Sequence, residues 1–250
     1  MSNKVFKIIN HGLSLNKISK SIRNKPIIRN ISINVQKGQV VGLLGPNGAG
    51  KTTAFHILVG LTRPDSGDVL LNGKKITDMP IFQRGNMGIS YLPQESSIFR
   101  GMTVEDNIYS ILEISEKDKK LRFIKLENLL NEFDISHLRK SSAAVLSGGE
   151  KRRLEIARTL AANPEYLLMD EPLTGIDPIS IGDIKKIITE LKKKNIGIII
   201  TDHNVRETLN IVDIVYIASE GSIIDSGLPN KVIENEEVKS SYLGSGFSLG

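Results

Sequence analysis

Continuous apolar runs of strand length, separated by segments with helical spacing, dominate the hydrophobic pattern of this 250-residue chain. Runs without alternation are typical of strands that are buried on both faces of a largely parallel sheet. The segments between the runs carry apolar residues on one helical face. The pattern therefore predicts an α/β core with strands at residues 31–35, 39–44, 69–71, 89–92, 166–169, 196–201, 214–218 and 222–225.

One long stretch, residues 104–138, has helical spacing and no strand pattern, which predicts a helical lobe inserted into the α/β core. No Pro-, Gly- or Ser-rich linker, internal repeat or long heptad run divides the chain, which excludes long coiled-coil arms. We therefore expect a single domain over residues 1–250. Its expected parts are a core at about 1–94 and 164–228, a helical subdomain at about 95–163 and a C-terminal helical tail at about 229–250.

The composition limits which kinds of site and which cellular compartment fit this chain. Cysteine is absent and the four histidines have no zinc-binding spacing, which excludes disulfides and thiolate metal sites and fits a reducing, cytoplasmic compartment. The first ten residues, Met1–Asn10, contain Lys4 and Lys7 but no long apolar segment, and no apolar run approaches the roughly 20 residues of a membrane span. We therefore expect the chain to be soluble by itself.

A net charge of +5 and a pI near 9.2 can indicate a nucleic-acid partner or an anionic membrane surface. The Lys-rich stretches 117–120 and 192–194 instead have the pattern of solvated helix faces or helix ends. Aromatic residues do not alternate with these lysines as a single-strand-binding surface requires. We favour solvated lysines and expect no nucleic-acid partner.

A glycine-rich loop, residues 45–52 (GPNGAGKT), follows the apolar run 39–44 and opens a helical pattern, the context in which a Walker A loop binds phosphates. Backbone amides and the helix N-terminus attract the phosphates, Lys51 adds a full charge, and the Thr52 hydroxyl can bind Mg²⁺. The alternative is a glycine-rich turn without a ligand, which the Lys-Thr pair disfavours. We assign nucleotide binding here to Gly45, Pro46, Asn47, Gly48, Ala49, Gly50, Lys51, Thr52 and Thr53.

The run 166–171 (YLLMDE) places two carboxylates at the end of a buried strand. Asp170 can hold Mg²⁺ through water, and Glu171 can polarise an attacking water, since positioning and charge stabilisation carry phosphoryl transfer. The alternative is an acidic strand end that caps the turn before Pro172. The Walker A loop favours the catalytic interpretation.

Two more polar residues follow apolar strands. His203 comes after the run 198–202, where an imidazole can hydrogen-bond a γ-phosphate and orient Glu171. Gln94 comes after the predicted strand 89–92, where it can reach the metal and the attacking water. The alternative for His203 is a surface residue without a catalytic role. A glutamine in a loop is common, so the assignment of Gln94 depends only on the motifs that accompany it.

A second glycine motif, residues 146–150 (LSGGE), begins another helical pattern. Ser147 and Glu150 form a capping box, and apolar residues follow at helical spacing at Leu154, Ala157, Leu160 and Ala161. Capping does not explain Gly148 and Gly149, which weaken a helix but let bare amides approach an anion. We infer that two copies enclose one nucleotide, with Ser147, Gly148 and Gly149 binding from the second copy.

In this order and spacing, the motifs resemble the ATP-binding cassette (ABC) family of ATPase subunits over essentially the whole chain. Within that family, the chain is similar to the ATPases of lipopolysaccharide exporters. The closer match is carried by residues 91–100 (YLPQESSIFR), 146–164, 170–172 with 175–188, 200–209 (ITDHNVRETL) and 242–247 (YLGSGF).

The resemblance implies a P-loop ABC ATPase fold, with a RecA-like core, an antiparallel β subdomain and an inserted helical subdomain. It implies a homodimer that closes around two Mg·ATP and drives two membrane subunits from the cytoplasmic face of the bacterial inner membrane. Asp177, in the run 175–178 (GIDP), would face the partner copy at the nucleotide. The membrane subunits would insert coupling helices near Ile98, Phe99 and Arg100, for which the alternative is packing at the start of the helical lobe. The assigned sites are catalytic Glu171, His203 and Gln94, and metal-binding Thr52, Gln94 and Asp170.

Two positions depart from the family pattern. Aligning residues 27–35 with the family places Ile22 where an aromatic residue usually stacks on adenine, so we expect weak discrimination of ATP from GTP. Glu150 stands where many members have Gln, which the capping box accommodates.

Three alternatives remain open at this point. They are the ATPase of another ABC transporter, such as the branched-chain amino-acid type, a soluble ABC ATPase, and a nucleotide-gated binding module without turnover. The presence of both Glu171 and His203 disfavours the binding module.

Overall fold

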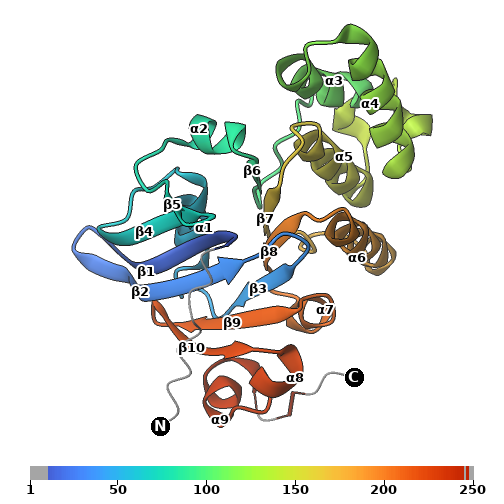
Figure 1. Ribbon diagram of the computed structural model, residues 1–250. Helices are drawn as coiled ribbons and strands as arrows, with labels where there is room; N and C mark the ends of the chain where they lie inside the picture. Colours follow the sequence, from blue (N-terminus) through green and yellow to red (C-terminus); the bar gives the residue numbers. More distant parts are fainter. Residues whose placement is uncertain (1–10, 245, 248–250) are drawn as a thin grey trace.

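The computed structural model describes residues 11–244, 246 and 247, which form two sheets and a helical lobe (Figure 1). The segment Met1–Asn10 and the end of the predicted C-terminal tail lie outside these residues. Within the described part, no helix combines the length and the apolar character needed to cross a membrane.

The larger sheet has six strands in the order β10-β9-β3-β8-β7-β6. Its neighbouring strands run parallel, except for the antiparallel pair of β9 and β10. All residues of β3, β7 and β8 are buried, which confirms that these apolar runs lie between two covering layers. The strands are β3 (Val40–Leu44), β6 (Ile89–Leu92), β7 (Tyr166–Asp170), β8 (Gly197–Thr201), β9 (Ile214–Ser219) and β10 (Ser222–Gly227).

The smaller sheet is antiparallel, in the order β2-β1-β4-β5. The hydrophobic pattern did not predict its central strand, β1. The pairing of β1 with β2 shifts register between Leu15 and Ile18, and Lys17 within that interval has a φ of 50°, so the alternation of apolar side chains changes phase there. The strands are β1 (Leu13–Ile22), β2 (Lys25–Val35), β4 (Ser66–Leu71) and β5 (Lys74–Lys75).

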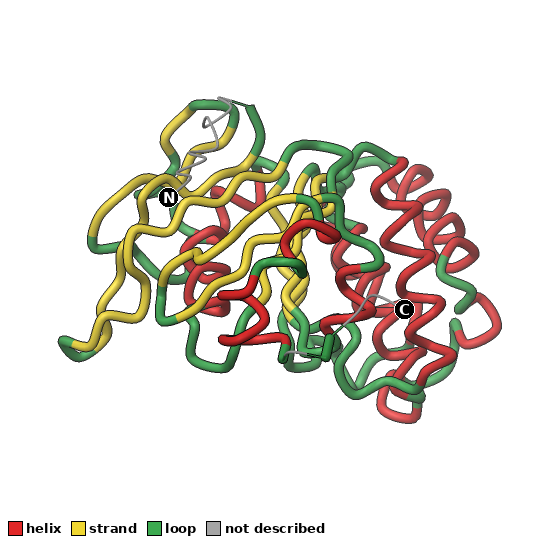
Figure 2. The backbone as a smooth tube through the Cα atoms, turned by 90° about the horizontal axis from the view of Figure 1, so that it is seen from below, coloured by secondary structure: helices red, strands yellow, loops and turns green. Residues whose placement is uncertain are grey.

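The predicted helical stretch 104–138 contains two α-helices and a short 3₁₀ turn, as expected. Together with α5 these helices form the helical lobe, which Figure 2 shows grouped at one side of the molecule, away from the antiparallel strands. We propose the boundaries at about residues 95 and 163 for this lobe. The helices are α1 (Lys51–Val59), α2 (Ile81–Asn86), α3 (Val104–Ser115), α4 (Lys119–Glu132), η1 (Ser136–Leu138), η2 (Ala143–Val145), α5 (Gly148–Leu160), α6 (Pro178–Lys193), α7 (Val205–Leu209), α8 (Pro229–Val232), α9 (Glu236–Val238) and η3 (Lys239–Leu243).

Two apolar clusters cover the two faces of the parallel sheet. Along β7, Leu167 and Met169 pack into the cluster that includes α5, α6 and the lobe. Leu168, which points the other way, packs into the cluster that includes α1 and the antiparallel sheet. The sheet is therefore packed between two apolar layers, which fix the positions of its strand ends.

Candidate active site

The C-terminal ends of the parallel strands meet at one edge of the sheet, and the predicted catalytic residues follow them. β7 leads directly into Glu171, and His203 lies two residues after the end of β8. β3 leads into the phosphate loop, which we define as residues 45–50, and β6 into the segment that contains Gln94. Open α/β sheets bind ligands at this edge because the loops of neighbouring strands converge there.

The phosphate loop ends in a helix start that has no side-chain cap. Gly50 precedes α1 with a φ of 93°, and no side-chain hydrogen bond caps the helix there. Gly45 has a φ of 148°, and a Cβ at this position would lie 2.0 Å from the carbonyl oxygen of Ala218, so only glycine fits. The first N–H groups of α1 therefore lack a side-chain acceptor and suit an anion.

Lys51 is folded onto the phosphate loop. Its Nζ donates hydrogen bonds to the carbonyl oxygens of Gly45 at 2.7 Å and Pro46 at 2.9 Å. Burial lowers the pKa of Lys51, whereas the nearby carboxylates of Glu171 and Asp170 raise it. The charges of Lys51, Glu171 and Asp170 therefore interact with one another beside the phosphate loop.

Asp170 is held by two hydroxyl groups. It is 2% exposed, and its carboxylate oxygens accept hydrogen bonds from Thr201 Oγ1 at 2.6 Å and from the Tyr91 hydroxyl at 3.1 Å. Burial and the neighbouring carboxylate raise the pKa of Tyr91, so its hydroxyl stays protonated and donates. The sequence interpretation missed both donors. A hydroxyl at or near the end of an apolar strand was the only signal.

Glu171 is oriented by its backbone and by two side chains. Its φ is 49°, which is unusual for a residue with a Cβ, and its N–H donates to the carbonyl oxygen of Thr201 at 2.8 Å. Gln94 Nε2 donates to one carboxylate oxygen at 2.8 Å, and His203 Nε2 lies 2.8 Å from the other. The structure thus brings the three predicted catalytic residues together within one chain.

The predicted metal-binding residues supply oxygen atoms of the kind that Mg²⁺ prefers. Thr52 exposes its side chain at the start of α1, while Asp170 and Gln94 lie at neighbouring strand ends. Among the described residues, no group of three or more His, Asp or Glu side chains forms a metal site by itself. Mg²⁺ commonly takes only one or two carboxylates and completes its shell with phosphate oxygens and water, so this donor set fits.

A buried guanidinium joins α5 to the site, and the sequence interpretation also missed it. Arg152 is 6% exposed and forms an ion pair with Glu155 at 2.8 Å. It also donates to the carbonyl oxygens of Asp170, Pro172 and Pro93 at 3.2 to 3.3 Å. These carbonyls flank Glu171 and precede Gln94, so Arg152 links the helix that begins with the second glycine motif to both catalytic segments.

The second glycine motif begins α5 with the predicted capping box. Ser147 Oγ accepts from the Glu150 N–H at 3.3 Å, and the Glu150 carboxylate accepts from the Ser147 N–H at 2.8 Å and from its hydroxyl at 2.7 Å. These bonds lower the pKa of Glu150. Leu154, Ala157 and Ala161 are buried as predicted, and Leu160 is half-buried.

Gly149 is required by packing. A Cβ there would lie 2.2 Å from Ser180 Oγ, at the start of α6. Gly148 is exposed. The carboxylate of Asp177 caps α6 by accepting from the N–H groups of Ile179 at 3.1 Å and Ser180 at 3.0 Å. The contact of Asp177 with a nucleotide stays a prediction.

The structure contradicts the expected surface role of Ile98 in binding a coupling helix. The same role for Phe99 and Arg100 stays a prediction. Ile98 is 7% exposed and belongs to the core, so it supplies packing instead of a surface wall. Phe99 is 46% exposed, and its ring lies 4.7 Å from the Arg158 guanidinium carbon. Arg100 is exposed. Only Phe99 and Arg100 are therefore accessible to a partner.

Ile22 lies at the end of β1 and is 47% exposed. No aromatic ring occupies this position of the sequence.

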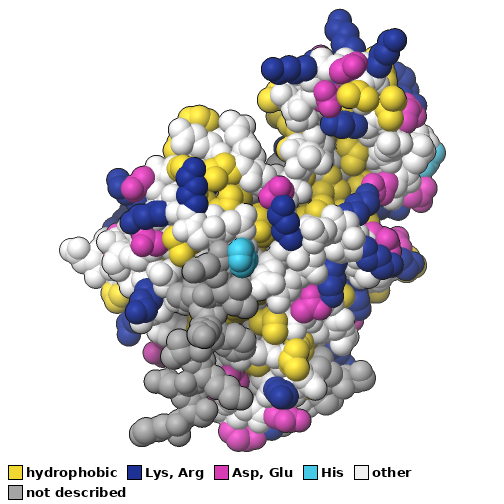
Figure 3. All heavy atoms as spheres, in the orientation of Figure 1, with side chains coloured by type: hydrophobic (Ala, Val, Ile, Leu, Met, Phe, Trp, Pro, Cys, Tyr) yellow, Lys and Arg dark blue, Asp and Glu magenta, His cyan; other side chains and the backbone are white. Residues whose placement is uncertain are grey.

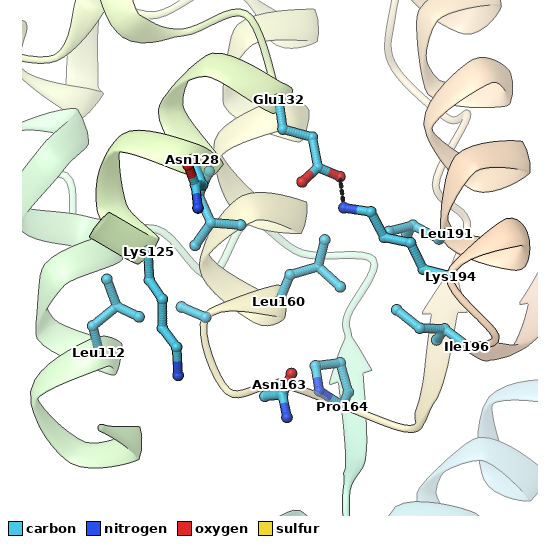
Figure 4. Close-up of a pocket in the computed structure, with 12 residues that line it drawn as sticks. Leu112, Lys125, Asn128, Glu132, Leu160, Asn163, Pro164, Leu191, Lys194 and Ile196 are labelled. Carbon is cyan, nitrogen blue, oxygen red and sulfur yellow. Dashed lines mark hydrogen bonds and ion pairs between the residues drawn. The ribbon is translucent and has the colours of Figure 1, made fainter. Parts of the chain in front are cut away.

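A cavity of about 330 Å³ lies away from the catalytic edge, between α4, the end of α5 and the end of α6 (Figure 4). Leu160, Pro164 and Ile196 are among the residues that line it. The ion pair of Lys194 with Glu132, at 2.5 Å, crosses its rim and joins the lobe to the core. This cavity marks a junction between lobe and core and contains none of the predicted site residues.

Comparison with known proteins agrees with the fold and with the motifs. The family model described as ABC transporter matches residues 28–174, which is more than half of the chain. The chain is 48% identical over 238 residues to the lipopolysaccharide export system ATP-binding protein LptB of Haemophilus influenzae, covering 95% of this chain and 99% of that protein.

Two further relatives give the same family. An uncharacterized ABC transporter ATP-binding protein of Rhizobium meliloti is 50% identical over 232 residues, covering 93% of this chain and 86% of that protein. The solved ADP conformation of MJ1267, an ATP-binding cassette of an ABC transporter, superimposes with a TM-score of 0.83 at 30% identity, covering 93% of this chain and 98% of that one. This chain belongs to the ABC transporter family and is an ATP-binding ATPase of that family.

Proposed function

We propose that this chain is the motor subunit of a transporter that moves lipopolysaccharide out of the bacterial inner membrane, using ATP hydrolysis as its energy source. The arrangement of Glu171 between Gln94 and His203, next to Lys51, carries the hydrolysis part of the proposal. The name of the Haemophilus influenzae relative supports the cargo, and favours lipopolysaccharide over a branched-chain amino acid.

Glu171 is the general base in this mechanism. Gln94 and His203 hold its two carboxylate oxygens, which fixes the direction in which the carboxylate faces the attacking water. His203, 47% exposed, can in addition donate to the γ-phosphate. Lys51 leaves its two loop carbonyls and neutralises the charge that develops on the phosphoryl oxygens.

Thr52, Asp170 and Gln94 would hold Mg²⁺ in the proposed site. Bound there, Mg²⁺ would supply positive charge that neutralises the phosphate oxygens. Thr201 and Tyr91 keep the Asp170 carboxylate in place for this role. Removal of Mg²⁺ with EDTA should abolish phosphate release, and its return should restore it. Full activity in EDTA would refute the metal assignment.

Two copies of the chain form the proposed working unit. α5 begins on an exposed surface, and the exposed apolar side chains of Val145, at 76%, and Ile179, at 82%, lie beside the capping box and the Asp177 turn. Exposed apolar side chains around a polar motif are typical of an interface. We propose that this surface meets the phosphate loop of a second copy, so that Ser147, Gly148, Gly149 and Asp177 complete its nucleotide site.

Two membrane subunits complete the transporter, and they place the chain on the cytoplasmic face of the inner membrane. We propose that their coupling helices contact Phe99 and Arg100. Both residues are exposed, and the neighbouring Asn107 accepts from the Phe99 N–H at 2.8 Å, which holds this segment against α3. A partner helix there would act on a segment five residues from Gln94.

An affinity pull-down of the tagged chain from detergent-solubilised native membranes, followed by mass spectrometry, tests the cargo. Two polytopic subunits with lipopolysaccharide-export components are the expected stoichiometric partners. Recovery of amino-acid permease subunits would support the ATPase role with a different transported substrate. The absence of any membrane partner would refute the transporter proposal.

A further inference from the structure

The beginning of α4, at the outer end of the helical lobe, exposes large apolar side chains next to lysines. Leu121 is 44% exposed, Phe123 57% and Ile124 56%. Leu126 and Leu130 of the same helix supply the lobe core, on the side away from Leu121 and Ile124. Leu121 and Ile124 are therefore additional to what folding of the lobe requires, and Phe123 extends this exposed surface from the edge of the core.

This apolar surface has a fixed shape. Asp118 caps α4 by accepting from the Lys120 N–H at 2.7 Å, so the first turn is anchored. The Phe123 ring packs against Tyr109 of α3, with ring centroids 5.6 Å apart. Ile114, in the last turn of α3, is 84% exposed. In Figure 3, hydrophobic side chains at the outer end of the lobe have Lys and Arg side chains beside them.

The positive charges at this end divide into two sets. Lys125 pairs with Glu116 at 2.8 Å, and Arg122 lies 3.9 Å from Glu113. Over residues 11–244, 246 and 247, by contrast, Lys117, Lys119 and Lys120 form no ion pair and are exposed. Arg122 and Lys125 thus engage Glu113 and Glu116, and the only other carboxylate in the segment that carries the three lysines is the cap Asp118, so a net positive charge remains beside Leu121, Phe123 and Ile124.

We propose that this surface, which we call the α4 lipid surface (Lys117, Lys119, Lys120, Leu121, Phe123 and Ile124), binds the anionic headgroups of a phospholipid bilayer. Lysines beside exposed aromatic and aliphatic side chains on a helix match the two components of such a membrane, its negative surface and its apolar boundary.

Membrane binding here does not require nucleotide or the membrane subunits, so its failure is separate from failure of the proposed transport function. The surface contains none of the residues assigned to the nucleotide site. It gives a direct contact with lipid in addition to the proposed contacts at Phe99 and Arg100. Residues 117–120 are exposed, as expected for solvated lysines, and the proposal adds the membrane-surface alternative for this segment.

Vesicle flotation of the purified full-length chain tests the proposal. We expect binding to vesicles of phosphatidylcholine with about one-third phosphatidylglycerol, little binding to pure phosphatidylcholine, and loss of binding at high salt, because charge attraction is screened. Lys119→Gln with Lys120→Gln should lower the bound fraction roughly tenfold at low salt. Phe123→Ser with Ile124→Ser should lower it at both salt concentrations.

Matched controls lie elsewhere on the surface. Lys25→Gln with Lys74→Gln removes two exposed lysine charges that form no ion pair within the part of the chain that the structure describes, and Phe82→Ser removes an aromatic side chain that is 64% exposed on α2. Neither control should change the bound fraction, and ATP turnover should be unchanged in all four variants. Equal losses in the controls, salt-independent binding to neutral vesicles, or no binding to anionic vesicles would each overturn the proposal. A dimer without lipid that Phe123→Ser with Ile124→Ser disrupts would assign the surface to a second copy instead.

Discussion

Two helices of this protein begin with glycine motifs, and they differ in whether a side chain caps the free N–H groups of the first turn. α1 follows Gly50 without a side-chain cap and has Lys51, Asp170 and Glu171 around its start. α5 follows Ser147, which forms a complete capping box with Glu150. The first helix start therefore suits a ligand and has the groups for chemistry beside it. The second is stable without a ligand and has no catalytic carboxylate of its own.

This difference in capping indicates which part of the proposed nucleotide site a single chain supplies. Glu171, Gln94 and His203 are already in contact on the α1 side. The α5 side is joined to them only through Arg152, which reaches the carbonyls behind the catalytic residues. A single chain thus assembles the hydrolytic side and presents its second glycine motif outward.

Glu171→Gln gives the largest expected effect. Loss of the general base should lower the rate of phosphate release by roughly a thousandfold while ATP binding is retained, because the amide keeps the side-chain volume. Single-turnover phosphate release and nucleotide binding measure the two quantities separately. Comparable residual activity in Glu171→Gln and the wild type would remove Glu171 from the mechanism.

A mixture of two inactive variants tests whether one nucleotide site combines the two helix starts. Lys51→Ala disables the α1 side, and Ser147→Arg blocks the α5 side. If each site uses α1 of one copy and α5 of the other, an equal mixture contains intact sites and should regain about a quarter of wild-type turnover, since half of the random dimers are mixed. Each variant alone should remain inactive. Failure of the mixture, with mixed dimers demonstrated, would contradict the two-copy site.

Ile22→Tyr tests base recognition on the α1 side. A ring at this exposed position should raise kcat/KM for ATP over GTP by up to about tenfold, the range of one aromatic stacking contact. Steady-state kinetics with both nucleotides measure the ratio. Equal gains for the two nucleotides, or none, would show that residue 22 does not face the base.

Ser147→Ala breaks the cap of α5 and should cost about 1 kcal/mol of unfolding free energy. Thr103→Ala is a matched control, because Thr103 caps α3 by accepting from the Asp106 N–H. The two variants should lose similar stability in urea, whereas only Ser147→Ala should also lower ATP turnover. A turnover loss of the same size in Thr103→Ala would mean that stability alone explains the effect.

Glu150 gives the smallest expected effect, which depends on pH. Hydrogen bonds from Ser147 lower the pKa of Glu150 in the folded chain, so the ionised carboxylate stabilises the fold. This contribution is present above the unfolded pKa, near 4.3, and is lost as pH falls through the lowered folded value. The stability gap between wild type and Glu150→Gln should therefore narrow as the pH falls from neutral to about 3. Urea unfolding at the two pH values measures it, and a constant gap would contradict the role of the charge.

Local patterns in the chain predicted much of the fold and of the candidate site. The apolar runs located β3, β6, β7 and β8, because strands buried on both faces have a strong and short-range hydrophobic signal. The same patterns failed for β1, where a register shift with a left-handed Lys17 interrupts the alternation that identifies a strand.

The phosphate loop, the capping box and the order of the catalytic residues could be predicted from sequence alone, since each depends on neighbours within a few positions. Tertiary packing, by contrast, brings Tyr91 and Thr201 to Asp170 and brings Arg152 to three carbonyls. It likewise decided that Ile98 is buried. These contacts join residues far apart in the chain, so they depend on the pairing of β6, β7 and β8 and on how the helical lobe packs against the sheet.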